Sequence, residues 1–329
     1  MTVRFLAFTD RGLTLARRIA HTLGGDAARC GENCPLVPWT ASAFDEADAL
    51  VYVGAVGIAV RAIAPFVKCK TTDPAVIVVD ETGQFVIPIL SGHLGGANGL
   101  ARQIASRCGG VAVITTATDL HGVFPVDLWA KAQNCAILEP ERIKEISARL
   151  LAGETIAFAS EWPISGTVPS GLISGAEGGF TVSVWRKPDS RLHLVPRIAV
   201  LGVGCKKGTP EKTIEKALFS LLEETGLCPE AVFQVCTIDR KGEEPGLLAF
   251  CADHGWPLRV FSSQALAAVP GTFTASAFVE RTTGVDNVCE RAAVLGSGGI
   301  LVVPKRAGTG VTLAAALAPY TPDWRWQDV

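Results

Sequence analysis

The chain has 329 residues, of which 48% are hydrophobic and 19% are charged, and its formal net charge is −2. This composition favours well-buried cores over disorder, and the length allows two or three domains. Because no run of Lys and Arg exceeds a pair, we expect no nucleic-acid partner, which normally requires a basic face.

The sequence predicts neither a membrane span nor a metal centre. The longest run without charge, at 82–101, contains Ser, His, Asn and several Gly, so it is too polar for an apolar span of about 20 residues. Asp10 and Arg11 follow a short apolar stretch, which predicts a strand and turn rather than a signal peptide. Cys30 and Cys34 form a C-x3-C pair, but no second pair accompanies them. We therefore expect reduced thiols in a cytoplasmic protein rather than a zinc site.

Short β-branched runs alternate with amphipathic stretches along the chain. Strands separated by helical crossovers predict an α/β fold with mainly parallel sheets. We expect an N-terminal α/β domain at 1–119, a small middle α/β domain at 120–196 and a C-terminal α/β domain at 197–329. The predicted strands are 3–8, 49–53, 75–79, 111–114, 155–159, 197–203, 232–236, 258–260 and 300–303. The predicted helices are 12–23, 58–66, 97–107, 139–151, 210–225, 245–254 and 288–295.

A glycine-rich turn follows the predicted strand at 49–53. In GAVGIAVRAIAP, Gly54 and Gly57 would let the backbone turn tightly and approach a ligand, and Arg61 would add a fork of donors. The N-terminus of the following helix would present free N–H groups to a carboxylate or phosphate. A strand–helix turn with a solvated arginine also explains the pattern.

Charged residues surround the next predicted strand, at 75–79. Lys70 and Asp73 lie in the loop before it, and Asp80 and Glu81 follow its end. Ligands of open α/β sheets bind beyond the carboxyl ends of strands, which makes Asp80 and Glu81 candidates for chemistry. The alternative is a hairpin turn with solvated acids.

The motif SGHLGGAN, at 91–98, crowds three glycines, a serine, a histidine and an asparagine before a predicted helix. Its glycines permit close backbone approach, and the helix N-terminus suits an anion. His93 can take or give a proton near neutral pH, since an imidazole has an ordinary pKa of about 6.5. An ordinary helix start with His93 as a spacer is the alternative. The other candidate binding residues of the motif are Ser91, Gly92, Gly95, Gly96 and Asn98.

A second glycine-rich segment, LGVGCKKGTPEKTIEKAL, begins at position 201. Gly204, Lys206 and Lys207 could meet ligand carboxylates. The spacing of Gly202, Gly204 and Gly208 resembles a dinucleotide-binding loop, but its third glycine comes one residue too late. A nucleotide-dependent oxidoreductase is therefore a weaker interpretation of this segment.

Taken together, these blocks resemble the cobalt-precorrin-5A hydrolases of anaerobic cobalamin biosynthesis. The middle of the chain, about 120–194, matches the family poorly at the level of motifs. The later blocks are similar to the family's C-terminal domain, which also occurs alone in the related aerobic pathway. The matching segments, in chain order, are VGAVGIAVRAIAPFVKCKTTDPAVIVVDETGQFVIPILSGHLGGANGLARQIA, VITTATD, GVGCKKGT, GEEPGL and TTGVDNV.

The resemblance implies the reaction. The family's substrate is a cobalt-bearing tetrapyrrole with a δ-lactone on its periphery. Water opens the lactone, and a two-carbon unit leaves as acetaldehyde in a retro-aldol-type cleavage, which gives cobalt-precorrin-5B. Since the cobalt arrives with the substrate, the resemblance implies no metal site and no cofactor of the protein's own.

The resemblance also implies roles for the candidate residues. His93 or Asp80 would activate the water, while Lys70, Asn98 and the backbone at 95–96 would stabilise the oxyanion. The flat, carboxylate-rich substrate would be bound by cations and helix N-termini. The predicted substrate-binding residues are Gly54, Gly57, Arg61, Asp73, Ser91, Gly92, Gly95, Gly96, Asn98, Gly204, Lys206 and Lys207.

A non-catalytic corrinoid-binding or carrier protein of the same pathway is the main alternative, because glycine loops and cations serve binding equally well. Acetaldehyde release separates the two. Besides the cobalt-precorrin, the partners we expect are a second copy of the chain, in a homodimer, and neighbouring pathway enzymes in transient contacts.

Overall fold

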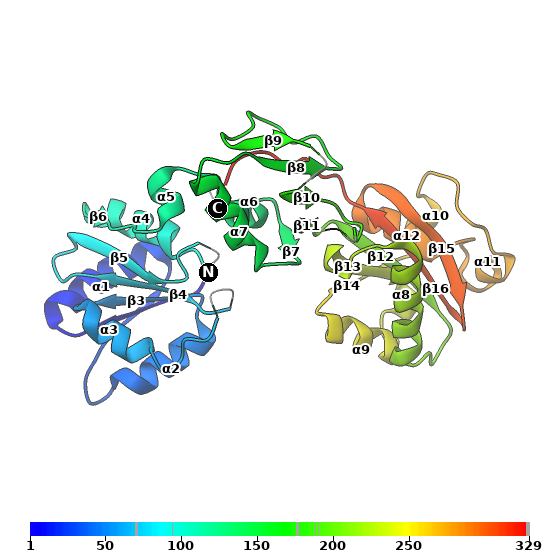
Figure 1. Cartoon of the computed structure of the whole chain (residues 1–329). Helices are drawn as coiled ribbons and strands as arrows, with labels where there is room; N and C mark the ends of the chain where they lie inside the picture. The colour runs from blue at the N-terminus through cyan, green and yellow to red at the C-terminus, as the bar shows by residue number, and fades with distance from the viewer. Residues whose placement is uncertain (70–71, 94, 176–177, 188, 190, 327–329) are drawn as a thin grey trace. The chain divides into compact units, whose positions relative to one another are not determined.

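The computed structural model describes residues 1–69, 72–93, 95–175, 178–187, 189 and 191–326 (Figure 1). Its contacts divide the chain into two compact units, Met1–Lys131 with Trp326, and Ala132–Arg325. The described part of the first unit contains one sheet and that of the second contains two, so the predicted α/β class with mainly parallel strands is confirmed. The division into three domains stays a prediction, since 120–131 joins the first unit.

The sheet of the first unit has the strand order β2-β1-β3-β4-β5-β6. β1 to β4 are parallel, β5 is antiparallel to β4, and β6 is parallel to β5. The strands are β1 (Val3–Ala7), β2 (Asp26–Arg29), β3 (Ala49–Val53), β4 (Ala75–Val79), β5 (Phe85–Leu90) and β6 (Val111–Ala112). The helices are α1 (Asp10–Leu23), α2 (Leu36–Glu46), α3 (Val56–Ile63), α4 (Ala97–Cys108), α5 (Ala117–His121) and α6 (Val126–Ala132).

Helices cover both faces of this sheet (Figure 1). Successive strand residues point to opposite faces, so Val51 of β3 packs with α1 and α4, and its neighbour Tyr52 packs with α2 and α3. Both side chains are fully buried. A strand covered on both faces must be apolar throughout, which is why β3 and β4 are the continuous runs ALVYV and AVIVV.

The reversal of β5 determines which loops can meet. The register pairs Val76 with Leu90 and Val79 with Val86. The loop after β5 and the start of α4 therefore lie at the edge where β4 begins, whereas Asp80 follows β4 at the other edge. At about 3.3 Å per residue, the six residues of β5 separate the two edges by about 17 Å.

The second unit begins with a sheet in the order β7-β11-β10-β8-β9, in which only the β7–β11 pair is antiparallel among the pairs described. The last strand of this sheet ends at position 196, and the first strand of the next sheet begins at position 199. The elements are β7 (Cys135–Ile137), α7 (Arg142–Leu151), β8 (Ile156–Ser160), β9 (Leu172–Ser174), β10 (Phe180–Val182) and β11 (Leu192–Pro196).

The last sheet has the order β14-β13-β12-β16-β15, with α8 and α9 against one face and α12 against the other. β12, β13 and β14 are parallel, and β15 and β16 form an antiparallel hairpin beside β12. The strands are β12 (Ala199–Cys205), β13 (Val232–Ile238), β14 (Leu258–Phe261), β15 (Ile300–Gly308) and β16 (Val311–Leu317). The helices are α8 (Glu211–Thr225), η1 (Pro229–Ala231), η2 (Asp239–Lys241), α9 (Pro245–His254), α10 (Ser263–Ala267), α11 (Ala277–Thr283) and α12 (Cys289–Ser297).

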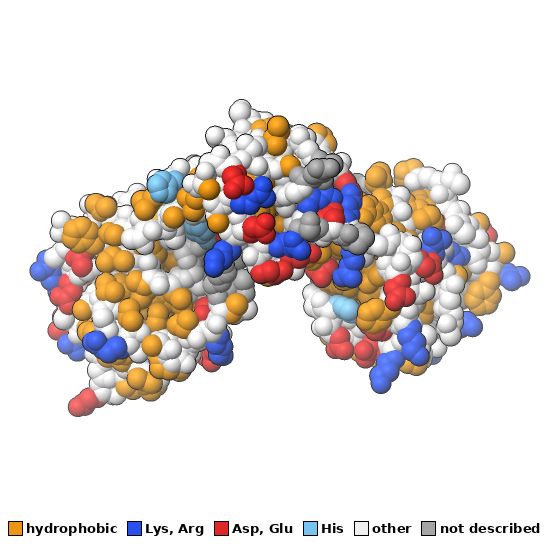
Figure 2. Space-filling model, viewed as in Figure 1, with side chains coloured by type: hydrophobic (Ala, Val, Ile, Leu, Met, Phe, Trp, Pro, Cys, Tyr) orange, Lys and Arg blue, Asp and Glu red, His pale blue; other side chains and the backbone are white. Residues whose placement is uncertain are grey.

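Basic and acidic side chains are interspersed on the face of the molecule that Figure 2 shows, in keeping with a net charge of −2. Within the described ranges, no helix is both long enough and apolar enough to cross a membrane.

Candidate functional site

The SGHLGGAN loop connects β5 to α4 at the edge where β4 begins. Ser91 donates a hydrogen bond from its hydroxyl to the carbonyl oxygen of Asp73, at 2.9 Å. The Asp73 carboxylate in turn accepts from the backbone N–H groups of Lys68 and Cys69, at 2.9 and 3.0 Å. Both predicted binding residues thus hold two loops together, and Asp73 is buried.

Gly95 is required at its position because a Cβ there would overlap the Cβ of Ser91. The close turn brings Gly96, which has φ +83°, to the N-cap of α4. Gly92 lies beside the Asn98 side chain at the same helix start. The closely spaced glycines of the SGHLGGAN motif therefore allow the loop to fold so that the side chains of His93 and Asn98 face the same space.

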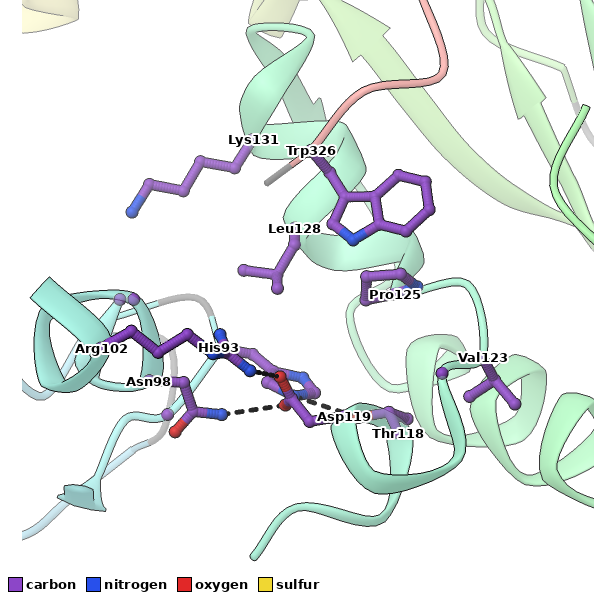
Figure 3. A pocket seen from close by; sticks show the side chains of 14 residues that line it. His93, Asn98, Arg102, Thr118, Asp119, Val123, Pro125, Leu128, Lys131 and Trp326 are labelled. Carbon is purple, nitrogen blue, oxygen red and sulfur yellow. Dashed lines mark hydrogen bonds and ion pairs between the residues drawn. The ribbon is translucent and has the colours of Figure 1, made fainter. Parts of the chain in front are cut away.

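His93 lies between two carboxylates, those of Asp119, which Figure 3 shows beside it, and Asp127. Its Nε2 is 2.9 Å from Oδ2 of Asp119 and 3.0 Å from the hydroxyl of Thr118, both on α5. On the other side of the ring, Nδ1 forms an ion pair with Oδ2 of Asp127, on α6, at 3.6 Å. The side chains of His93 and Asp127 are 21% and 9% exposed, so the group is shielded but still reachable.

These carboxylates raise the pKa of His93. Asp127 contributes most, burial of the ring opposes it, and Asp119 adds to the rise. Both carboxylates accept hydrogens, so the charged imidazolium satisfies both sides of the ring at once. His93 is therefore better suited to donating a proton than to taking one from water as its first act.

Asp119 is the acceptor at the centre of this network. Asn98 donates to its Oδ2 at 3.0 Å, and Thr116 and Arg102 donate to the same carboxylate. Burial opposes ionisation of Asp119, but the hydrogen bonds from Thr116, Arg102 and His93 outweigh it and lower the pKa of Asp119 to about 2. A permanent negative charge thus lies against the imidazole.

A cavity of about 500 Å³ opens in front of these groups, within the first unit. Figure 3 shows His93, Asn98, Arg102 and Asp119 on one side of it, and Pro125, Leu128 and Trp326 across from them. Lys131 lies on the same helix as Leu128, and Val123 lies beside Thr118. An acid, an amide, a guanidinium and an apolar wall together suit a large ring with carboxylates at its edge.

Asp80 lies at the opposite edge of the sheet, so it does not share a site with His93. Its carboxylate accepts hydrogen bonds from the hydroxyl and backbone N–H of Thr82 and from the backbone N–H of Phe85. Burial opposes ionisation, but these bonds outweigh it and lower the pKa of Asp80. Glu81 accepts from the Thr9 hydroxyl at 2.7 Å. These contacts hold the turn after β4 together, and a catalytic role for Asp80 stays a prediction.

The first glycine turn is at that opposite edge as well. The backbone N–H of Gly54 donates to the carbonyl of Val79 at 2.8 Å. Arg61 is exposed in the last turn of α3, with its guanidinium near Gly57. The sheet therefore separates these three predicted binding residues from His93. Lys70 lies outside the described residues.

Gly204, Lys206 and Lys207 line a different cavity, of about 700 Å³, in the last sheet's part of the second unit. Lys241 and Lys305 also line it, so four cations surround a largely apolar space. Its apolar lining includes Phe278, Val279 and Val288.

Two sequence motifs hold this second cavity in shape. Glu244 of GEEPGL accepts from the backbone N–H of Gly208 and from the Lys241 ammonium, the latter at 2.8 Å. Asn287 of TTGVDNV caps α12 by accepting from the backbone N–H of Glu290 at 2.8 Å. Motifs far apart in the sequence thus meet around one space.

The nucleotide-binding interpretation of this segment is wrong. Gly202 and Gly204 lie inside β12, whereas a dinucleotide loop requires them in the turn after the strand. A Cβ on Gly202 would overlap the carbonyl oxygen of Cys289. The glycine is needed because α12 packs directly on the strand.

Several residues of this site were not among the residues predicted from the sequence. Arg102, Asp119 and Trp326 line the cavity, and Asp127 contacts His93. Asp119 ends the VITTATD segment, which was its one available signal. Asp127 and Trp326 belong to no motif, and only the fold brings them to His93. The described residues include no group of three or more His, Cys, Asp or Glu placed to hold a metal ion.

Three family models match successive parts of the chain. The models "Cobalamin synthesis G N-terminal", "Cobalamin biosynthesis central region" and "Cobalamin synthesis G C-terminus" match residues 38–119, 124–177 and 199–316. A crystal structure of a cobalamin biosynthesis protein G homologue from Sulfolobus solfataricus aligns at 21% identity and a TM-score of 0.42, covering 97% of each chain.

Two curated relatives are closer in sequence. The cobalt-precorrin-5A hydrolase of Priestia megaterium is 32% identical in an alignment that covers 85% of this chain and 81% of the relative. The cobalt-precorrin-5A hydrolase of Salmonella typhimurium is 33% identical, with 84% of each chain covered. This chain belongs to the cobalt-precorrin-5A hydrolase family.

Proposed function

We propose that the chain hydrolyses cobalt-precorrin-5A in cobalamin biosynthesis, opening the δ-lactone and releasing acetaldehyde. The two curated relatives of that name, each aligned over more than four-fifths of the chain, support the reaction. The observation on the molecule that carries the proposal is His93, held between Asp119 and Asp127 on an open cavity.

The imidazolium of His93 acts first as a general acid. Water adds to the lactone carbonyl, the acyl C–O bond breaks, and His93 gives its proton to the departing alkoxide. The new carboxylic acid is ionised near neutral pH and loses its proton to solvent, so His93 ends this step as the neutral imidazole. The two flanking carboxylates favour its later recharging, because they stabilise the charged ring.

In the second step, a base removes the proton from the hydroxyl group that lactone opening has formed. Removing the hydroxyl proton lets the C–O bond become the carbonyl of acetaldehyde, while the electron pair of the breaking C–C bond passes into the conjugated macrocycle. The macrocycle then takes up a proton. Neutral His93 can accept the hydroxyl proton, so one side chain serves both steps. The Asn98 amide donates to Thr116 and Asp119 in the same network, so donation to the oxyanion of the first step requires it to exchange one of these partners.

The test is acetaldehyde release from cobalt-precorrin-5A by the purified chain, measured by coupling the aldehyde to alcohol dehydrogenase. We expect many molecules of acetaldehyde per protein molecule. Tight binding of the cobalt-precorrin without any release of acetaldehyde would instead identify a carrier and overturn the proposal.

The pH dependence of this reaction follows from the raised pKa of His93. The imidazolium is present below that pKa and is lost as the pH rises through it. We expect kcat for acetaldehyde release to be flat below the raised pKa and to fall above it, at a pH higher than an ordinary histidine would give. The profile of kcat against pH checks this; a rate that instead increases through that range would require His93 to act first as a base.

The second cavity is proposed to bind carboxylates of the substrate through its lysines. Replacing Lys206 and Lys207 together by alanine should raise KM about tenfold, since each exposed charge pair contributes up to about 1 kcal/mol, and should leave kcat nearly unchanged. Steady-state kinetics measure both constants. The matched control is the exposed pair Lys212 and Lys216 of α8, which does not line the cavity. An equal change in the control would point to a general effect of charge.

The remaining expectations stay predictions. These are the absence of a cofactor beyond the substrate's own cobalt, a homodimer, transient contacts with neighbouring pathway enzymes, and a cytoplasmic location. Light scattering on the purified chain would test the homodimer.

A further inference from the structure

The wall opposite His93 is formed by side chains that the sequence did not connect with the site. Pro125 lies just before α6 and Leu128 lies on it. Trp326 follows the second unit in the sequence but belongs to the first unit, and it lines the same cavity. Figure 3 shows the indole of Trp326 beside Leu128 and Pro125, across the cavity from the His93–Asp119 pair.

The indole is fixed from behind. The ring of Phe124 meets that of Trp326 edge-to-face, with centroids 5.4 Å apart and an interplanar angle of 86°. Phe124 is itself buried and contacts Trp129, at 5.8 Å between centroids. Trp326 is only half-buried. An aromatic ring that is fixed on one side and open to a cavity on another offers a rigid contact face with little conformational entropy to lose.

We propose that Trp326 is a substrate-positioning residue, which stacks on the tetrapyrrole ring and holds its lactone edge against His93. The proposal rests on the function proposed above, and it adds the part of the site that binds the ring. A conjugated macrocycle presents a flat apolar face with its carboxylates at the edge. The cavity presents the complementary arrangement, an indole and aliphatic side chains facing a polar side that contains Arg102 and Asn98.

Kinetics separate this role from catalysis. Trp326→Ala should raise KM for cobalt-precorrin-5A about tenfold, and Trp326→Phe, which keeps an aromatic face, should restore most of the loss. A smaller fall in kcat is expected for Trp326→Ala, because a loosely held ring presents its lactone less often. Trp162→Phe, a partly buried tryptophan of the second unit, is the matched control. Thermal unfolding of each variant identifies any loss of fold.

A spectroscopic measurement identifies contact directly. The chain has seven tryptophans, so 5-fluorotryptophan labelling gives seven fluorine signals, and Trp326→Phe assigns the one from Trp326. Cobalt-precorrin-5A is added to labelled His93→Gln protein, in which turnover is expected to be slow enough for the complex to be observed. We expect the Trp326 signal to shift or broaden more than the others. An unchanged Trp326 signal at substrate concentrations well above KM, or an unchanged KM in Trp326→Ala, overturns the proposal. Either result leaves acetaldehyde release by the wild-type chain, and hence the proposed function, as a separate question.

Discussion

Replacing His93 by glutamine should lower kcat for acetaldehyde release by between about 10² and 10⁴, the usual contribution of a general acid–base residue. Glutamine keeps hydrogen-bonding groups near Asp119 and Thr118 but cannot carry the proton that the two steps exchange. Because the apolar wall is unchanged, KM should change much less than kcat. Steady-state rates of acetaldehyde formation measure both effects.

His121→Gln is the matched control for that substitution. His121 ends α5, two residues after Asp119, but it is exposed and does not line the cavity. We expect its rate to equal that of the wild type. A wild-type rate in His93→Gln would remove His93 from the mechanism and redirect attention to the Asp119–Asn98 pair.

Replacing Asp119 by asparagine should have the second largest effect, and the effect should depend on pH. The substitution removes one of the two charges that raise the pKa of His93, so the fall of kcat moves to lower pH. We expect the variant to lose about tenfold more activity near about pH 8 than near about pH 6. Profiles of kcat against pH for both proteins check this, and parallel profiles would contradict it. Asp80→Asn, at the other edge of the sheet, should leave kcat within about twofold.

The same carboxylate contributes to the stability of the fold. The pKa of Asp119 is about 2 in the folded chain, below its ordinary value. Its contribution to the unfolding free energy is therefore complete at pH values above that ordinary pKa, and this contribution is lost as the pH falls toward about 2. The difference corresponds to about 2 kcal/mol of unfolding free energy. Urea unfolding of wild type and Asp119→Asn should differ near neutral pH and converge in acid.

Local patterns predicted the α/β class and many of the strand–helix units, but they missed seven of the described strands, and two of these, β16 and β5, show the physical reasons. β16 contains LAAAL, and alanine is a strong helix former; here Ala314, Ala315 and Ala316 are fully buried between β12 and β15. β5 contains Pro88, which disfavours a strand, yet it pairs with Ile77. In both cases tertiary packing outweighs local propensity.

Local sequence patterns also predict only part of the candidate site. Glycine spacing predicts a binding loop around His93, because that motif is local in sequence. Asp80 was predicted from its place after the end of a strand, but the antiparallel β5 carries the chain across the sheet between Asp80 and His93. The fold alone brings Trp326 to the cavity and Asp127 to the ring of His93. Residues that the fold brings together from distant parts of the chain form no local pattern in the sequence.

The return of Trp326 to the first unit affects how this cavity could be inherited. A stretch of 132–325 separates the indole from the rest of the cavity in the chain. A gene fragment that encodes 1–131 alone would specify His93, Asp119 and Asp127 but an incomplete wall. Recombination at the boundary between the units would therefore exchange a sheet together with a proton-transfer network, and leave the aromatic contact behind.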